Sequence, residues 1–151
     1  MKAIDLGLSV MWGDCNLGSN SPEKPGGLYT WTKATEMKNG LDIAGQMLGK
    51  GWRLPTYEEV EELLSNRFSP CYSYFSFGIE VQGINGNSIF LPASQIDING
   101  FSSNGQYWAG TLDDENPGYA TQFRFDKRGV WGGSNKIEYV SRGNVDNEVK
   151  L

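Results

Sequence analysis

Residues 51–56 (GWRLPT) and the segment that follows them constrain the fold of this chain more than any other stretch of its sequence. Thr56 is a favourable helix N-cap residue, and Glu59, three positions later, completes a capping box. Pro55 disfavours helical backbone at the residue before it, so the helix has a defined start. Apolar residues then recur at the spacing of one helical face, and the pattern predicts a helix over residues 57–66.

Length and charge indicate a single-domain protein and exclude several classes of partner. We expect residues 1–151 to form one domain, because a chain of this length buries a sizeable core. The formal charge is -5 and there is no basic run, which argues against nucleic acid as a partner. No apolar run approaches the length of a membrane span, so we expect no membrane insertion. The first ten residues lack the features of an export signal, which leaves open the cytosol, a particle carried outside the cell, or an exported mature form.

The chain contains no histidine, which removes the commonest general base and the commonest metal ligand together. Two cysteines, Cys15 and Cys71, are too few for a zinc site and have no histidine to activate them as nucleophiles. They form either a disulfide or two buried thiols, and the residues alone slightly favour the thiols. We therefore expect a protein that is not an enzyme and that uses no cofactor.

Helical patterns lie early in the chain and strand patterns late, so the expected class is α+β with mostly antiparallel strands. A short helix should start after Asp42, with Ile43, Met47 and Leu48 on its inner face. Residues 75–82 alternate apolar and polar side chains, and an Asn-Gly turn then returns the chain as a hairpin. The expected strands are residues 3–12 (one strand, or two broken at Gly7), 28–32, 75–82, 88–91, 106–111, 119–125, 130–131, 137–140 and 145–151.

Four segments resemble, in order, the motifs of one known family. They are residues 4–18 (IDLGLSVMWGDCNLG), 42–64 (DIAGQMLGKGWRLPTYEEVEELL), 85–94 (NGNSIFLPAS) and 105–111 (GQYWAGT). Together they resemble the Fibrobacter succinogenes major paralogous domain proteins over nearly the whole chain. The last residues, 141–151 (SRGNVDNEVKL), are similar to the end of that family but depart from it at Asn147, Glu148 and Lys150.

The resemblance implies a C-type-lectin-like fold, with two helices, a twisted and mostly antiparallel sheet, and long loops. First and last strands usually pair in such domains, so residues 3–10 and 145–151 should be neighbours. The resemblance also implies that Cys15 and Cys71 lie close together, and raises the odds of a disulfide between them. Members of the family are mostly surface or secreted proteins of gut bacteria, and similar folds serve as phage receptor-binding proteins and as targets of diversity-generating retroelements. The implied location is extracellular, on a cell surface or on a virion.

Two loops carry the oxygen ligands that hard cations prefer. Residues 95–100 partly match the opening of an EF-hand loop, but Gln95 and Gln106 stand where the motif has acidic residues. Residues 113–116 (DDEN) form a denser acidic cluster, for which solvation in a loop is the better interpretation. The sugar-binding calcium motifs of lectins are absent, so we expect no metal.

Tryptophans divide into two groups. Trp12, Trp31, Trp52 and Trp108 fall at positions typical of the family and on expected strands, which favours core packing for each. Trp131 differs, because glycines flank it and leave little to pack against locally. Such a tryptophan either anchors a ligand or folds back on the sheet.

A candidate contact surface follows from the late strands. In residues 119–125 the apolar positions 121, 123 and 125 alternate with a face formed by Ala120, Gln122 and Arg124. If this strand pairs with the next one, their polar faces and the loop at 112–118 form one surface. The predicted ligand-binding residues are Asp113, Asp114, Asn116, Tyr119, Gln122, Arg124, Trp131, Asn135 and Tyr139.

These observations predict a non-catalytic binding module that contacts a protein or glycan on another cell or particle through its C-terminal strands and loops. Two alternatives stay open: a diversified display protein, as a retroelement target or a phage receptor-binding protein, and a structural subunit that buries the same face in a homo-oligomer. A hydrolase is a distant further option, because no carboxylate pair in the sequence has a defined spacing.

Overall fold

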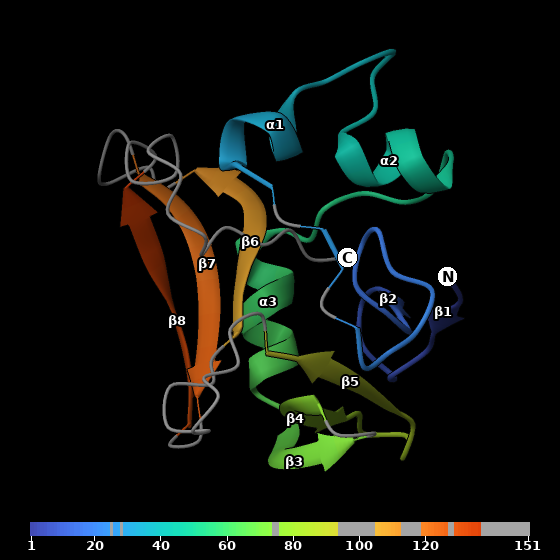
Figure 1. Ribbon diagram of the computed structural model, residues 1–151, viewed down its shortest axis with the longest axis vertical. Coiled ribbons are helices and arrows are strands. Elements are labelled where there is room, and N and C mark those ends of the chain that lie inside the picture. Colours follow the sequence, from blue (N-terminus) through green and yellow to red (C-terminus); the bar gives the residue numbers. More distant parts are fainter. Residues whose placement is uncertain are drawn as a thin grey trace.

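The computed structural model describes residues 1–24, 26–27, 29–73, 76–93, 105–112, 119–126 and 129–136, and within these ranges it is an α+β protein (Figure 1). The segments 67–77 and 129–136, together with residues 106, 111, 112, 119 and 126, are described by their backbone and strand register alone. No helix within the described ranges combines the length and the apolarity that a bilayer crossing requires. In chain order the elements are β1 (Ala3–Ile4), β2 (Trp12–Gly13), α1 (Trp31–Thr35), α2 (Ile43–Leu48), α3 (Tyr57–Leu64), β3 (Arg67–Ser73), β4 (Ser76–Gln82), β5 (Ser88–Pro92), β6 (Gly105–Leu112), β7 (Tyr119–Asp126) and β8 (Gly129–Lys136).

The starts of α2 and α3 are fixed by side chains, as the sequence predicts. The Thr56 hydroxyl accepts the N–H of Glu59, and the Glu59 carboxylate accepts the N–H of Thr56, so both halves of the capping box are present. Helix α3 ends at Leu64, two residues before the predicted end. Asp42 caps α2 by accepting the N–H of Gly45 at 3.1 Å.

Helix α1 replaces the strand that we expected over residues 28–32, so the described ranges hold three helices rather than two. The Thr30 hydroxyl accepts the N–H of Lys33 at 3.2 Å, which starts a helix at the next residue. The indole N–H of Trp31 donates to the carbonyl of Ala109 at 3.4 Å and ties the helix to β6. A local cap and one tertiary contact therefore outweigh the β propensity of threonine and the aromatics.

All strand pairs are antiparallel and form three small sheets, β1-β2, β3-β4-β5 and β6-β7-β8. The predicted hairpin is present, with Gln82 opposite Ser88 across the Asn-Gly turn. Strand β3 was not predicted, since Pro70 lies inside it, but β3 is the edge strand of its sheet, where proline is tolerated. Strands β1 and β2 are the ends of the predicted strand 3–12 and pair with each other. The expected strands 137–140 and 145–151, and the pairing of the last one with residues 3–10, lie outside the described residues.

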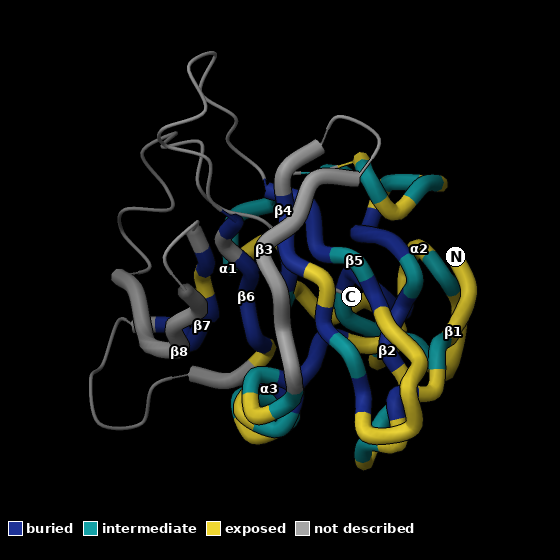
Figure 2. The backbone as a smooth tube through the Cα atoms, turned by 90° about the horizontal axis from the view of Figure 1, so that it is seen from below, coloured by how far each residue is buried: buried dark blue, intermediate teal, exposed yellow. Residues whose placement is uncertain are grey.

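Two apolar cores hold these layers together. In Figure 1, α1 and α2 lie at one end, β3-β4-β5 at the other, and α3 between them beside β6. The larger core joins Val60 and Leu63 of α3 to both three-stranded sheets, and buried residues run along β4 and β6 in Figure 2. The second core lies on the opposite face of β6-β7-β8, where Trp108 and Ala120 pack with residues of α1 and α2. The inner face of α2 is Ile43, Ala44 and Gly45, whereas Met47, predicted to point inward, is 48% exposed.

A buried tyrosine links the N-terminal loop to the sheets. The Tyr107 hydroxyl donates to the carbonyl of Pro92 at 2.5 Å and accepts the side-chain amide of Asn16 at 3.0 Å. Its ring stacks on Phe123 with the centroids 5.0 Å apart. One side chain therefore connects three segments that are far apart in sequence.

Replacing Tyr107 by phenylalanine should lower the free energy of unfolding by about 2 kcal/mol, because the buried carbonyl of Pro92 and the buried amide of Asn16 each lose a hydrogen bond. Urea denaturation followed by tryptophan fluorescence measures this change. Tyr29→Phe is the matched control, since among the described residues its hydroxyl donates to the weak acceptor sulfur of Met47, and it should shift stability by less than about 0.5 kcal/mol. Equal stability of the wild type and Tyr107→Phe would show that the hydroxyl does not hold the loop.

Candidate functional site

The pairing that the predicted contact surface required is present between β7 and β8. Arg124 lies opposite Trp131, and Ala120 lies opposite Asn135. On its other side Arg124 lies opposite Gln106 of β6. Residues opposite each other in antiparallel strands share a face, so Gln106, Arg124 and Trp131 form one row across the sheet.

Most of the predicted polar face of β7 is covered, which corrects the expectation from its alternating pattern. Ala120 is fully buried in the second core, and Gln122 is only 9% exposed. The reason is tertiary: Trp108 lies opposite Gln122, and the same face of the sheet meets α1 and α2. Among residues 120–125, Arg124 is the exposed one.

Other predicted residues are located in part or not at all. Tyr119 lies opposite Lys136, so it and Asn135 occupy the same end of the β7-β8 pair. The side chains of Tyr119, Trp131 and Asn135 are outside the described set. Asp113, Asp114, Asn116 and Tyr139 lie outside the described residues, as do the two candidate cation loops, residues 95–100 and 113–116.

Within the described ranges, no three or more acidic or cysteine side chains converge as a metal site would need. Cys15 is a free, buried thiol that contacts the carbonyl of Ser19 at 3.4 Å. Burial, and then the charge of Asp14, raise the pKa of this thiol to about 11, so it is protonated at neutral pH. The side chain of Cys71 is outside the described set.

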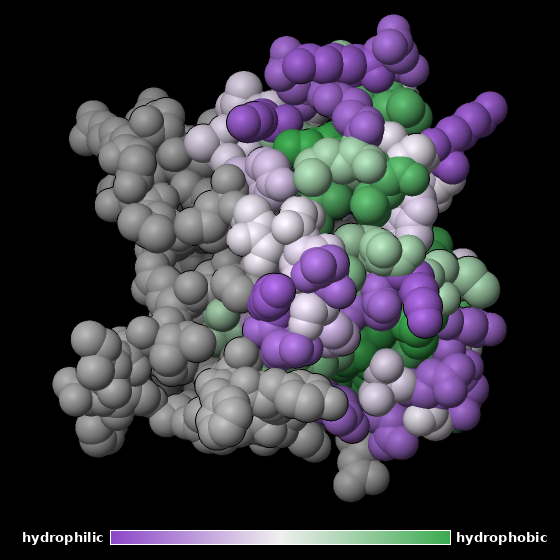
Figure 3. Space-filling model, turned by 45° about the vertical axis from the view of Figure 1, so that its right-hand side comes forward, coloured by the Kyte–Doolittle hydropathy of each residue, from purple (hydrophilic) through white to green (hydrophobic). Residues whose placement is uncertain are grey.

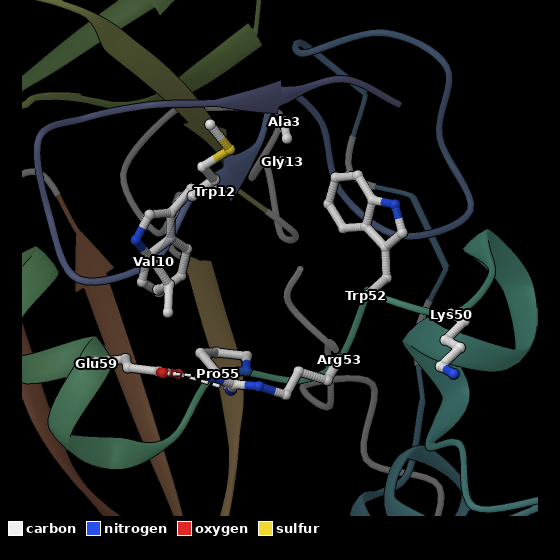
Figure 4. Close-up of a pocket in the computed structure, with 11 residues that line it drawn as sticks. Ala3, Val10, Trp12, Gly13, Lys50, Trp52, Arg53, Pro55 and Glu59 are labelled. Atoms are coloured by element: carbon white, nitrogen blue, oxygen red, sulfur yellow. Dashed lines mark hydrogen bonds and ion pairs between the residues drawn. The ribbon is translucent and has the colours of Figure 1, made fainter.

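A second candidate site, which the sequence did not predict, is a cleft between the β1-β2 hairpin and residues 50–59. We name it the Trp52 cleft; its volume is about 420 Å³. Figure 4 shows the indoles of Trp12 and Trp52 on opposite sides, with Arg53 and Pro55 below them. On the side of the molecule that Figure 3 shows, apolar surface alternates with hydrophilic side chains among the described residues. The lining residues are Ala3, Val10, Met11, Trp12, Gly13, Lys50, Gly51, Trp52, Arg53, Pro55 and Glu59.

An ion pair forms the polar part of the cleft. Arg53 donates from Nη1 to Oε2 of Glu59 at 2.8 Å and from Nη2 to Oε1 at 2.5 Å. Nη1 also donates to the carbonyl of Leu54 at 3.0 Å. The hydrogen bonds from Arg53 lower the pKa of the Glu59 carboxyl, and Glu59 in turn raises the pKa of Arg53. The Glu59 side chain is 13% exposed and the Arg53 side chain 52%. Solvent therefore screens the attraction between the two charges and reduces its contribution to stability.

Sequence reasoning missed the cleft because its two walls come from segments about forty residues apart. Trp12 is buried as predicted, but Trp52 is only partly buried and leaves aromatic surface in the cleft. The single local signal was the Arg53 to Glu59 spacing, which places a cation before a helix and an anion in its first turn.

Replacing Glu59 by glutamine should lower the free energy of unfolding by about 1–2 kcal/mol at pH 7, because a charge-assisted pair and half of the capping box weaken. The pKa of Glu59 is lower in the folded protein than its ordinary value of 4.5, so the stabilisation is complete above that value. It is lost as the pH falls from there through the folded pKa. The difference in unfolding free energy between wild type and variant should therefore shrink below about pH 4.5.

Glu58→Gln is the matched control, because Glu58 is exposed in the same helical turn. It should change stability by less than about 0.5 kcal/mol at pH 7. Chemical denaturation of the three proteins between pH 3 and pH 8 makes the comparison. A loss in Glu59→Gln that stays constant over this range would exclude the ion pair as its source.

Comparison with known proteins gives this chain no relative. No family model, no curated protein and no solved structure matches it.

Proposed function

We propose that this chain is a non-catalytic recognition module that contacts a protein or glycan through the exposed part of β6-β7-β8 around Arg124. The observation that carries the proposal is the exposure of Arg124 between buried neighbours on both sides along β7. The buried strand fixes the backbone of Arg124 and thereby the place on the surface from which its side chain projects. We refer to Gln106, Arg124 and Trp131 as the Arg124 row.

The composition of the Arg124 row supports this role. Arginine and tryptophan are enriched among residues that dominate binding energy at protein interfaces. Their backbone positions are set by the register of three antiparallel strands, with Phe123 and Phe125 of β7 buried in the larger core. Little ordering entropy is then lost on binding, which leaves more of the contact energy as affinity.

Two observations favour binding over catalysis. The sequence has no histidine, and the Cys15 thiol has a raised pKa and lies buried, so it is a poor nucleophile at neutral pH. In the described part of the chain no three acidic or cysteine residues lie together as a metal site would need.

We further propose that the chain adopts a C-type-lectin-like fold and is related to the Fibrobacter succinogenes major paralogous domain proteins. Support comes from the four sequence segments, from short helices followed by antiparallel sheets, and from the capped helix α3 at the expected place. On this proposal the protein acts outside the cell, on a cell surface or on a virion. Its partner is a protein or glycan of another cell or particle.

Replacing Arg124 by alanine should weaken binding of the ligand by about 2 kcal/mol, roughly thirtyfold in Kd, if Arg124 anchors the contact. A glycan and protein array probed with the labelled protein identifies the ligand, and calorimetry then measures each variant. Lys38→Ala removes another exposed cation, far from β7 in sequence, and is the control that should bind normally. The melting temperature of Arg124→Ala should stay close to that of the wild type. Unchanged affinity in both Arg124→Ala and Trp131→Ala would remove the Arg124 row as the contact surface.

A further inference from the structure

We propose that the Trp52 cleft binds a neutral saccharide, with a pyranose ring against Trp52 and its hydroxyl groups on the Arg53–Glu59 pair. This site goes beyond the proposed contact at the Arg124 row and does not depend on it. The cleft is formed by the N-terminal hairpin and residues 50–59, whereas the Arg124 row belongs to β6, β7 and β8.

The cleft has the size and the lining of a small-molecule site. Its volume of about 420 Å³ falls in the range of about 300–1,000 Å³ that such sites occupy. Its apolar wall comes from Val10, Met11, Trp12, Trp52 and Pro55, and polar surface, including Arg53 and Glu59, makes up nearly half of the lining. An apolar wall with placed polar groups binds a ligand that has both kinds of surface.

The aromatic surface comes from Trp52. Trp12 is only 2% exposed and acts as a fixed wall, whereas Trp52 is partly exposed and faces it across the cleft (Figure 4). Met11, 60% exposed, adds a flexible apolar side chain at the margin. The C–H groups of a sugar ring form the apolar surface that packs on an indole.

The polar groups match hydroxyls. A guanidinium has five N–H donors, and Arg53 uses three of them on Glu59 and Leu54 within the described residues. Two donors remain, one of them on Nη2 beside Oε1 of Glu59. That carboxylate oxygen accepts one hydrogen bond from Arg53, whereas Oε2 accepts from both Arg53 and the N–H of Thr56. A hydroxyl both donates and accepts, so one hydroxyl bridges the remaining Nη2 donor and Oε1.

The charges in and around the cleft favour a neutral ligand. Arg53 and Lys50 are balanced by Glu59 and by Asp42, whose charge also acts on Arg53. Glu59 would repel an anionic ligand, and Arg53 would repel a cationic one. In Figure 4 the Lys50 side chain extends away from the centre of the cleft, so it does not make the cleft cationic.

Nuclear magnetic resonance of the indole N–H groups tests the proposal directly. The chain has five tryptophans, and Trp52→Phe assigns the signal of Trp52 by its loss. The probes are the methyl glycosides of glucose, galactose, mannose and N-acetylglucosamine. At least one should shift the Trp52 signal saturably and leave the Trp31 signal in place. The methyl glycosides of glucuronic acid and glucosamine carry charge at pH 7. Each should bind several-fold more weakly than the methyl glycoside of glucose.

Variants separate a binding role from a structural one. Trp52→Phe, followed by calorimetry, should weaken binding of the best probe about tenfold, because a smaller ring offers less surface. Arg53→Lys keeps the charge but loses the planar fork and should also weaken it about tenfold. Trp31→Phe removes another partly buried indole outside the cleft, and Arg124→Ala alters the other surface; both should retain the Kd of the wild type.

The saccharide site would be overturned by no saturable shift with any of the four neutral glycosides, by equal affinity for neutral and charged probes, or by an unchanged Kd in folded Trp52→Phe and Arg53→Lys. The circular dichroism and the melting temperature of each variant establish that it is folded. Loss of probe binding in Arg124→Ala would also overturn it, because the sugar would then occupy the Arg124 row. Failure of the cleft to bind, with an intact effect of Arg124→Ala on the array ligand, would leave the proposed function standing.

Discussion

Where a stretch of chain without regular secondary structure enters a core, its backbone groups need hydrogen-bond partners, and residues 52–56, buried at Leu54 and Pro55, show how this protein supplies them. The N–H of Leu54 donates to Asp42, and its carbonyl accepts from Arg53. The carbonyl of Pro55 accepts the N–H of Gly110 at 2.7 Å. The N–H of Thr56 donates to Glu59. These partners come from the cap of α2, from β6 and from the first turn of α3, so one short segment joins three elements.

This connection fixes the relative positions of the two cores. Leu54 belongs to the second core, and α3, which starts immediately after the segment, carries Val60 and Leu63 into the larger one. Residue 110 is a glycine, and a side chain there would begin 3.2 Å from the Cβ of Leu54, which would push the segment away from β6. The close approach at Gly110 therefore keeps the segment against β6, and the carbonyl of Leu54 and the carboxylate of Glu59 hold the Arg53 guanidinium. The polar groups of the Trp52 cleft are consequently held in place by backbone contacts before any ligand binds.

Local signals in the sequence predicted the local structure and missed what depends on distant segments. The caps at Asp42 and Thr56 and the hairpin around the Asn-Gly turn are decided within a few residues, and they are present. Residues 28–32 were assigned to a strand by propensity, but the Thr30 cap and the bond from Trp31 to Ala109 form a helix instead. The alternation in β7 predicted that Phe123 and Phe125 share one face of the strand, and both are buried in the larger core. It could not show that the opposite face, with Ala120 and Gln122, is also covered. The Trp52 cleft escaped prediction for the same reason, because the β1-β2 hairpin and the segment after α2 meet only in the folded protein.

The two surfaces differ in how much of the fold depends on their residues. Glu59 caps α3, pairs with Arg53 and lines the cleft, so a change of its chemistry alters the helix start and the cleft together. Arg124 projects from a strand whose position is set by the buried rings of Phe123 and Phe125 and by its neighbours in the sheet. We therefore expect substitution at Arg124 to alter the surface while Phe123 and Phe125 keep the strand in the core. Under the two proposals, the site in the cleft depends on residues that also hold the fold, whereas the contact at the Arg124 row depends on side chains carried by a strand that the core already fixes.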